Sequence, residues 1–127
     1  MGVERIMTIA VSKNNLQKAK SIANQHANVF FSQGIHPHDA ADFDSDVEQT
    51  IRQNAADQKM LAVGEIGLDY YYNNCAASIQ QQAFTQQMHI ADELNLPVVI
   101  HSREACEDTQ QILQQFCDQF LLQTFNT

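Results

Sequence analysis

The chain is short of basic residues. It has 7 lysines and arginines against 15 aspartates and glutamates, which gives a formal net charge of -8. This balance excludes proteins that hold nucleic acid over a broad basic surface. It leaves open a site that meets a phosphate through bound metal ions, because a cation reverses the local field of an acidic site.

Cysteine pairs and long apolar runs are also absent from the sequence. Cys75, Cys106 and Cys117 form no C-x-x-C pair, so neither a disulfide scaffold nor a cysteine-based zinc site is indicated. Isolated cysteines of this kind are typical of a reducing compartment. No stretch approaches the roughly 20 apolar residues of a spanning helix, and the N-terminus lacks the apolar core of a signal peptide. We therefore expect a cytoplasmic protein with no membrane association.

The remaining pattern alternates between strands and helices. The length of 127 residues suits a single domain, residues 1–127, but not a complete eightfold β/α barrel of about 250 residues. Apolar runs predict strands over 5–11, 28–35, 60–69 and 96–102, and helical spacing predicts helices over 14–27, from Asp44 or Ser45, over 77–95 and from about Glu104. This order predicts an α/β fold of about four parallel β/α units, a partial TIM-like barrel.

Two further expectations concern burial. The strands are continuous apolar runs, which is typical of strands covered on both faces. The helices are rich in glutamine, and we expect these side chains to lie on solvated faces; they are Gln80, Gln81, Gln82, Gln86, Gln87, Gln110, Gln111, Gln114 and Gln115.

Side chains that can bind a metal, transfer a proton or bind a phosphate lie in or directly after three predicted strands. His36 and His38 follow the second strand, Glu65 lies within the third, and His101 and Arg103 end the fourth. Because the carboxyl ends of parallel strands meet at one edge of a sheet, these residues are expected to converge. Imidazole and carboxylate together suit zinc and also accept manganese or magnesium.

Each of these residues also has a structural interpretation. Glu65, in "AVGEIGL", is either a metal or catalytic carboxylate or one half of a buried ion pair. His101 is either a ligand or a hydrogen-bonded core residue. His36 and His38 are two residues apart, so they point the same way in an extended segment and suit a metal pair; a polar turn around Pro37 is the structural alternative.

The aromatic and basic residues near these strand ends leave alternatives as well. Arg103 either clamps a phosphate with its planar donors or pairs with Glu104 or Glu107. The run from Tyr70 to Tyr72 either stacks on a base or packs over the end of the sheet.

Several stretches together carry a family resemblance. They are "GIHPHDA", "AVGEIGLDYYY", "QQQAFTQQMHIADELNLPVVIHSREA" and "DTQQIL", in this order along residues 3 to 113. The chain resembles the TatD family of metal-dependent hydrolases, whose members are TIM-like barrels and typically deoxyribonucleases of the 3′-to-5′ exonuclease type. The resemblance implies hydrolysis of DNA or another phosphodiester.

The resemblance also implies roles for individual residues. Glu65 matches a metal-bridging catalytic glutamate, and His101 matches a metal-binding histidine. His36 matches a histidine that acts in catalysis beside the metals, and His38 and Arg103 match positions on the substrate side. The implied cofactor is a divalent metal, Mg²⁺, Mn²⁺ or Zn²⁺, which we expect to be weakly bound in this chain.

The sequence departs from the family pattern at one important motif. The H-x-H-x-D motif, which the family carries on its first strand and uses for metal binding, does not occur. The chain is therefore expected to cover about strands two to five of the barrel. Three hypotheses follow: an active metal-dependent nuclease, a catalytically inactive remnant, or a non-enzymatic binding or oligomerisation module. Exposed sheet edges also predict that two copies pair into a homo-oligomer.

Overall fold

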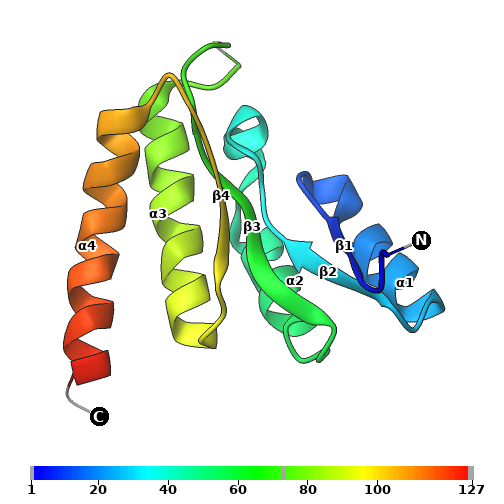
Figure 1. Cartoon of the computed structure of the whole chain (residues 1–127). Helices are drawn as coiled ribbons and strands as arrows, with labels where there is room; N and C mark the ends of the chain where they lie inside the picture. Colours follow the sequence, from blue (N-terminus) through cyan, green and yellow to red (C-terminus); the bar gives the residue numbers. More distant parts are fainter. Residues whose placement is uncertain (1, 73, 126–127) are drawn as a thin grey trace.

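The structure, a computed structural model, describes residues 2–72 and 74–125. Strands and helices alternate along the chain (Figure 1). The elements are β1 (Ile6–Ile9), the 3-10 helix η1 (Lys13–Asn15), α1 (Leu16–Gln25), β2 (Val29–Gln33), the 3-10 helix η2 (Pro37–Asp42), α2 (Ser45–Asn54), β3 (Met60–Asp69), α3 (Ala77–Leu94), β4 (Val98–Arg103) and α4 (Cys106–Phe125). Among the described residues no helix is both long and apolar enough to cross a membrane.

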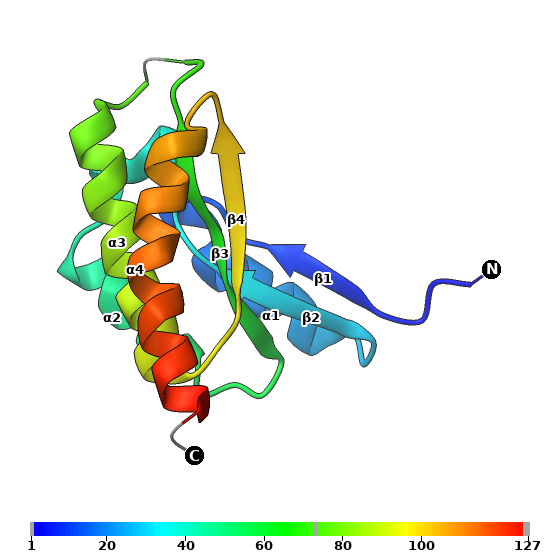
Figure 2. The same cartoon turned by 60° about the vertical axis from the view of Figure 1, so that its left-hand side comes forward.

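The four strands form one parallel sheet in the order β1-β2-β3-β4. Each strand therefore lies beside its neighbour in sequence, and each is followed by a helix, as in a β/α barrel. The sheet twists and curls from β1 to β4 (Figure 2). The predicted fold class, a partial TIM-like barrel of about four parallel β/α units, is confirmed.

The core lies between the sheet and its helices. Phe31 of β2, Ile66 of β3 and Phe84 of α3 are fully buried there. In β4, Val98 and Ile100 pack against this core, so the alternate residues Val99, His101 and Arg103 point to the other side of the strand.

The expectation that the strands are buried on both faces is wrong for part of the sheet. Ile6 and Ile9 of β1 are 51% and 40% exposed, and Leu61 of β3 is 42% exposed. β1 is an end strand with no neighbouring strand on one edge, and four strands do not close into a barrel that would cover the remaining face of the sheet.

A β-bulge interrupts β3 at Glu65. Gly64 pairs with Val99 and Ile66 pairs with Ile100, so Glu65 is the extra residue between them. Val63 and Ile66 both belong to the core although three positions separate them, which a regular strand with a period of two does not allow. The bulge therefore turns Glu65 out of the regular alternation, in the way bulges re-aim side chains beside functional sites.

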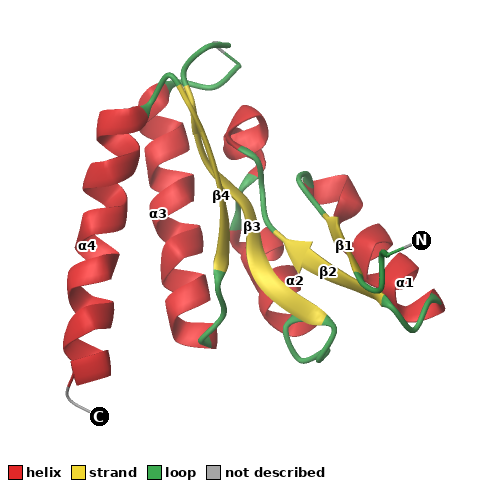
Figure 3. Ribbon diagram, viewed as in Figure 1, coloured by secondary structure: helices red, strands yellow, loops and turns green. Residues whose placement is uncertain are grey.

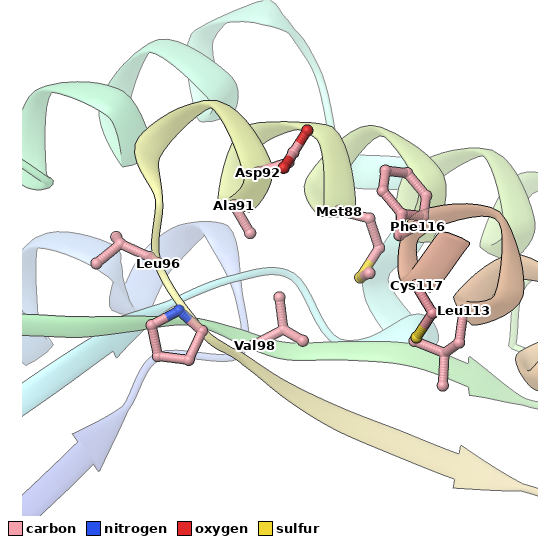
Figure 4. A pocket seen from close by; sticks show the side chains of 9 residues that line it. Met88, Ala91, Asp92, Leu96, Val98, Leu113, Phe116 and Cys117 are labelled. Atoms are coloured by element: carbon pink, nitrogen blue, oxygen red, sulfur yellow. The ribbon is translucent and has the colours of Figure 1, made fainter. Parts of the chain in front are cut away.

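An apolar hollow of about 220 Å³ lies between α3, α4 and the beginning of β4 (Figure 4). Its lining is Met88, Ala91, Asp92, Leu96, Pro97, Val98, Leu113, Phe116 and Cys117. Asp92 supplies the acidic group of this lining. The hollow lies at the amino end of β4, whereas His101 and Arg103 lie at its carboxyl end, so it is distinct from the polar site described next.

Candidate functional site

The loops that follow β2, β3 and β4 lie at one end of the sheet (Figure 3). Polar side chains gather at these carboxyl ends of the strands. His36 follows β2, Glu65 comes from the bulge of β3, and His101 from β4. One potential ligand atom from each of these three residues lies within 4.8 Å of the others. The convergence predicted from the sequence is therefore present for His36, Glu65 and His101.

Glu65 and His101 are in direct contact. Glu65 Oε1 lies 3.2 Å from His101 Nδ1, and the other ring nitrogen, Nε2, lies 2.8 Å from Asp69 Oδ2. A carboxylate only accepts hydrogen bonds, so Nε2 carries the proton that faces Asp69. In neutral His101 the unprotonated Nδ1 then lies 3.2 Å from a carboxylate oxygen, and a proton or a cation shared by the two atoms would offset the repulsion between them.

The separation of these two atoms fits a shared metal ion. Two ligands with bonds of about 2.0–2.2 Å lie roughly 3.0–3.5 Å apart when they bind one ion at angles of about 90–110°. The 3.2 Å between Glu65 Oε1 and His101 Nδ1 falls in this range. Asp69 holds His101 from behind, as carboxylates hold metal-binding histidines in other proteins. The donor set therefore fits a divalent cation.

Asp69, at the end of β3, organises the site, although its position at a strand end was all that the sequence indicated. Its side chain is 1% exposed, and its Oδ2 accepts hydrogen bonds from His101 Nε2 at 2.8 Å and from His38 Nε2 at 3.0 Å. Its Oδ1 accepts from the backbone N–H of Tyr71. Burial by itself raises the pKa of Asp69, but the hydrogen bonds from His101, Tyr71 and His38 outweigh burial and lower the pKa to about 2. Asp69 is therefore ionised and fixes two imidazoles at once.

His36 has a different hydrogen-bond pattern. Its Nδ1 accepts from the backbone N–H of His38 at 3.1 Å, so neutral His36 carries its proton on Nε2. Burial, together with the neighbouring imidazoles of His101 and His38, lowers the pKa of His36. The ring lies 4.5 Å from that of His101, centroid to centroid. His36 is therefore placed as a neutral N–H donor beside the Glu65–His101 pair.

His38 lies next to this group but outside it. Its ring is in edge contact with His36, with centroids 4.4 Å apart, while its Nε2 is held by Asp69. Within the described part of the chain, the cluster of close metal-binding atoms consists of His36, Glu65 and His101. The interpretation of His36 and His38 as a metal pair therefore has no support from this geometry.

Arg103 stacks on tyrosines and pairs with neither Glu104 nor Glu107. Its guanidinium carbon lies 3.9 Å from the ring centroid of Tyr71 and 5.2 Å from that of Tyr72. Tyr70 differs from its two neighbours, since its hydroxyl group donates to Asp108 at 2.7 Å. Of the two sequence interpretations of the tyrosine run, packing thus fits Tyr70, and Tyr71 and Tyr72 are half exposed.

Two glutamines of α3 support the loops that carry the site, and the expectation that they are solvated is wrong. Gln80 and Gln87 are each 1% exposed. Gln80 accepts from the backbone N–H of Asp69 and donates to its carbonyl oxygen. Gln87 accepts from the backbone N–H of Ile35 at 2.8 Å, directly before His36. Nothing in the sequence distinguished these two glutamines from the exposed ones on the same helix.

Four parallel β/α units with His, Glu and His at the carboxyl edge of the sheet are the arrangement of metal-dependent hydrolases built on β/α barrels. The chain belongs to the TatD related DNase family, whose model matches residues 1–124.

Two curated relatives and one solved structure illustrate the similarity. The chain is 34% identical over 113 residues to the uncharacterized metal-dependent hydrolase YabD of Bacillus subtilis, covering 89% of this chain and 44% of that protein. It is 32% identical over 117 residues to the 3′-5′ ssDNA/RNA exonuclease TatD of Escherichia coli, covering 92% of this chain and 45% of the relative. The crystal structure of the TatD homologue YJJV from Escherichia coli superposes with a TM-score of 0.82 at 26% identity, over 90% of this chain and 45% of that one. The chain thus spans less than half the length of the relatives it matches.

Proposed function

We propose that this chain carries part of the site of a metal-dependent phosphodiesterase that acts on single-stranded nucleic acid. The observation that carries the proposal is the 3.2 Å contact between Glu65 Oε1 and His101 Nδ1, with the second nitrogen of His101 held by Asp69. Metal dependence is a property of the family in general, and the assignment to Glu65 and His101 rests on this contact. The printed activity of the Escherichia coli TatD relative, a 3′-5′ exonuclease of single-stranded DNA and RNA, supports the substrate class.

In this proposal Glu65 and His101 hold a divalent cation, Mg²⁺, Mn²⁺ or Zn²⁺. When bound, the cation polarises a phosphate oxygen and lowers the pKa of bound water. Glu65 thereby serves both metal binding and catalysis. Two firm ligands are fewer than the three that catalytic zinc sites usually have, so we expect the cation to bind weakly.

The other residues of the site act on the substrate. His36 presents its Nε2 proton to a phosphate oxygen or to the leaving oxygen. Its lowered pKa keeps it neutral near pH 7, so that it donates without adding a charge that repels the cation. His38 lies against Tyr72 and contacts the bound strand, and Arg103 offers its planar donors to a phosphate.

A catalytically inactive site is the second candidate. The H-x-H-x-D motif does not occur in the chain, and the match covers 45% of the Escherichia coli relative. If the ligands of that motif are required, this chain binds metal without cleaving a phosphodiester. The proposal for an active enzyme and this alternative therefore agree on metal binding and differ on turnover.

We include a second copy of the chain in the proposal, because a single copy offers fewer metal ligands than a catalytic site usually has. The end strand β1 exposes Ile6 and Ile9, and β4 is the opposite end strand of the described sheet. Pairing of two copies through these edges covers apolar surface and unpaired backbone groups. Size-exclusion chromatography with light scattering tests this pairing, and a monomer at all concentrations contradicts it.

A cytoplasmic location stays a prediction.

The proposed activity is tested with a 5′-fluorescein-labelled single-stranded DNA oligonucleotide, with and without Mg²⁺, Mn²⁺ or Zn²⁺. We expect metal-dependent shortening from the 3′ end. Glu65→Gln should slow it by more than about 100-fold, because loss of even an outer partner of a metal ligand costs about 10–100-fold.

Glu4→Gln is the matched control, since Glu4 is exposed near the N-terminus, and it should cleave as the wild type does. Equal cleavage by wild type and Glu65→Gln contradicts the proposal. Metal binding without any cleavage by the wild type favours the inactive alternative.

A further inference from the structure

Arg103 and two tyrosines form a stacked group beside the candidate site. The guanidinium carbon of Arg103 lies 3.9 Å from the ring centroid of Tyr71, which is cation–π distance. The rings of Tyr71 and Tyr72 meet edge to face, with centroids 4.6 Å apart and an interplanar angle of 88°. We call Tyr71, Tyr72 and Arg103 the aromatic platform.

The platform leaves its polar and aromatic groups available. Tyr71 is 50% exposed and Tyr72 is 47% exposed. Within residues 2–72 and 74–125, the side chain of Arg103 makes no hydrogen bond or ion pair, and its contacts are the two rings. Its five N–H donors are therefore open to a ligand.

Three other cations of the chain are engaged by partners. Lys13 pairs with Asp44, Arg52 pairs with Glu48 and Glu93, and Lys59 donates to the carbonyl oxygens of Ala23, His26 and Val29. Arg103 differs from these three because aromatic rings hold it and, among the described residues, no carboxylate or carbonyl group accepts from its side chain. It suits an anionic partner.

Two contacts connect the platform with the metal-binding pair. Tyr72 meets the ring of His38 edge to face, with centroids 5.6 Å apart, and His38 shares Asp69 with His101. Arg103 lies two residues after His101 in β4, so both point to the same side of the strand. A ligand on the platform therefore lies next to the Glu65–His101 pair.

A purely structural role explains the platform less well. The preceding residue, Tyr70, shows what a packing tyrosine looks like here: its ring is partly buried against the core, and its hydroxyl group is bonded to Asp108 and Gln81. Within the described part of the chain, Tyr71 and Tyr72 show neither feature. Large aromatic surfaces that stay exposed beside a site for nucleic acid are typical of stacking on unpaired bases.

We propose that the aromatic platform binds an unpaired nucleobase and its phosphate, and so makes the site selective for single strands. The base stacks on the exposed planes of the tyrosine rings and the guanidinium group, while the edge of Arg103 donates to the phosphate. A base inside a duplex is stacked on both faces and paired at its edge, so it is not free for this contact. This inference rests on the proposed function.

The experiment compares two fluorescein-labelled strands by fluorescence anisotropy in EDTA, which prevents cleavage. One strand is tetrathymidylate, and the other is an abasic tetramer with the same phosphates. We expect the wild type to bind the thymine strand about tenfold more tightly, the low to middle part of the range for base–aromatic stacking.

Variants separate stacking from bulk and charge. Tyr71→Leu with Tyr72→Leu keeps apolar volume but removes the ring faces, and should reduce the preference to below about twofold. The double change to phenylalanine keeps the rings and should retain the preference. Arg103→Lys keeps the charge but loses the planar group, and should weaken both strands. Tyr70→Phe is the matched control and should change nothing in this assay.

The inference is overturned by equal binding of the two strands to the wild type, by no binding of either, or by a preference that survives the leucine variant. These outcomes are distinct from failure of the proposed function. Cleavage is scored separately with metal, so a thymine preference without any metal-dependent cleavage contradicts the proposed activity and leaves the platform in place.

Discussion

Gly67→Ala should damage the fold and the site together. Gly67 pairs with His101 across β3 and β4. A Cβ atom at position 67 would overlap the carbonyl oxygen of His101, and the residue has a φ of +140°. Both the space and the backbone conformation therefore require glycine at this position.

Two contributions set the expected loss of stability. An L-residue at this φ costs about 1–3 kcal/mol. Relieving the overlap requires β3 and β4 to separate locally, and the loss of one or two ladder hydrogen bonds costs about 1 kcal/mol each. The free energy of unfolding should therefore fall by about 2–5 kcal/mol, and His101 should move relative to Glu65.

Urea denaturation followed by circular dichroism measures this loss. Gly2→Ala is the matched control, because no atom lies within 4 Å of a Cβ at position 2. The control should stay within about 0.5 kcal/mol of the wild type. If Gly67→Ala is also that close, the stated approach of β3 to β4 at His101 is refuted.

Two other changes test the supports of the structure. Gln87→Leu leaves the buried backbone N–H of Ile35 without its partner and should lower the free energy of unfolding by about 1–3 kcal/mol. The matched control, Gln86→Leu, changes an exposed position of the same helix and should stay within about 0.5 kcal/mol of the wild type. Equal urea midpoints for the two variants contradict the role of Gln87. Lys59→Met removes an ammonium group that donates to three carbonyl oxygens between the last turn of α1 and the start of β2 and should cost about 1.5–3 kcal/mol in the same assay. A loss no larger than that of Lys18→Met, at an exposed position, shows that these contacts are not stabilising.

The strand pattern made most of the fold predictable. The third strand was predicted over 60–69, and β3 is Met60–Asp69; the fourth was predicted over 96–102, and β4 is Val98–Arg103. Parallel order follows from the alternation of strands and helices. The exposed face of the sheet was not predictable from apolar runs, because a strand of an open sheet and a strand of a closed barrel have the same composition.

The convergence of His36, Glu65 and His101 was predictable because strand ends of a parallel sheet meet. The bulge at Glu65 and the role of Asp69 were not. A bulge shows only in the pairing of two strands, and Asp69 gains its importance from two histidines that are 31 and 32 residues away in sequence.

The burial of two glutamines was also not predictable from the sequence. Gln80 and Gln87 have the same side chain as Gln81 and Gln86, and only their partners distinguish them: Gln80 bonds the backbone of Asp69, and Gln87 bonds the backbone of Ile35. Buried polar side chains need such partners, but a single sequence does not indicate where the partners lie.

The most direct test of the account is Mn²⁺ binding followed by electron paramagnetic resonance. The wild type should bind Mn²⁺ at a site that Glu65→Gln and His101→Ala each abolish, because the first change removes the charge of the carboxylate and the second removes the imidazole nitrogen of the 3.2 Å pair. His26→Ala, at an exposed histidine after α1, should bind as the wild type does. Mn²⁺ binding that is unchanged in Glu65→Gln and His101→Ala, or absent from the wild type, contradicts the claim that these two residues hold the metal.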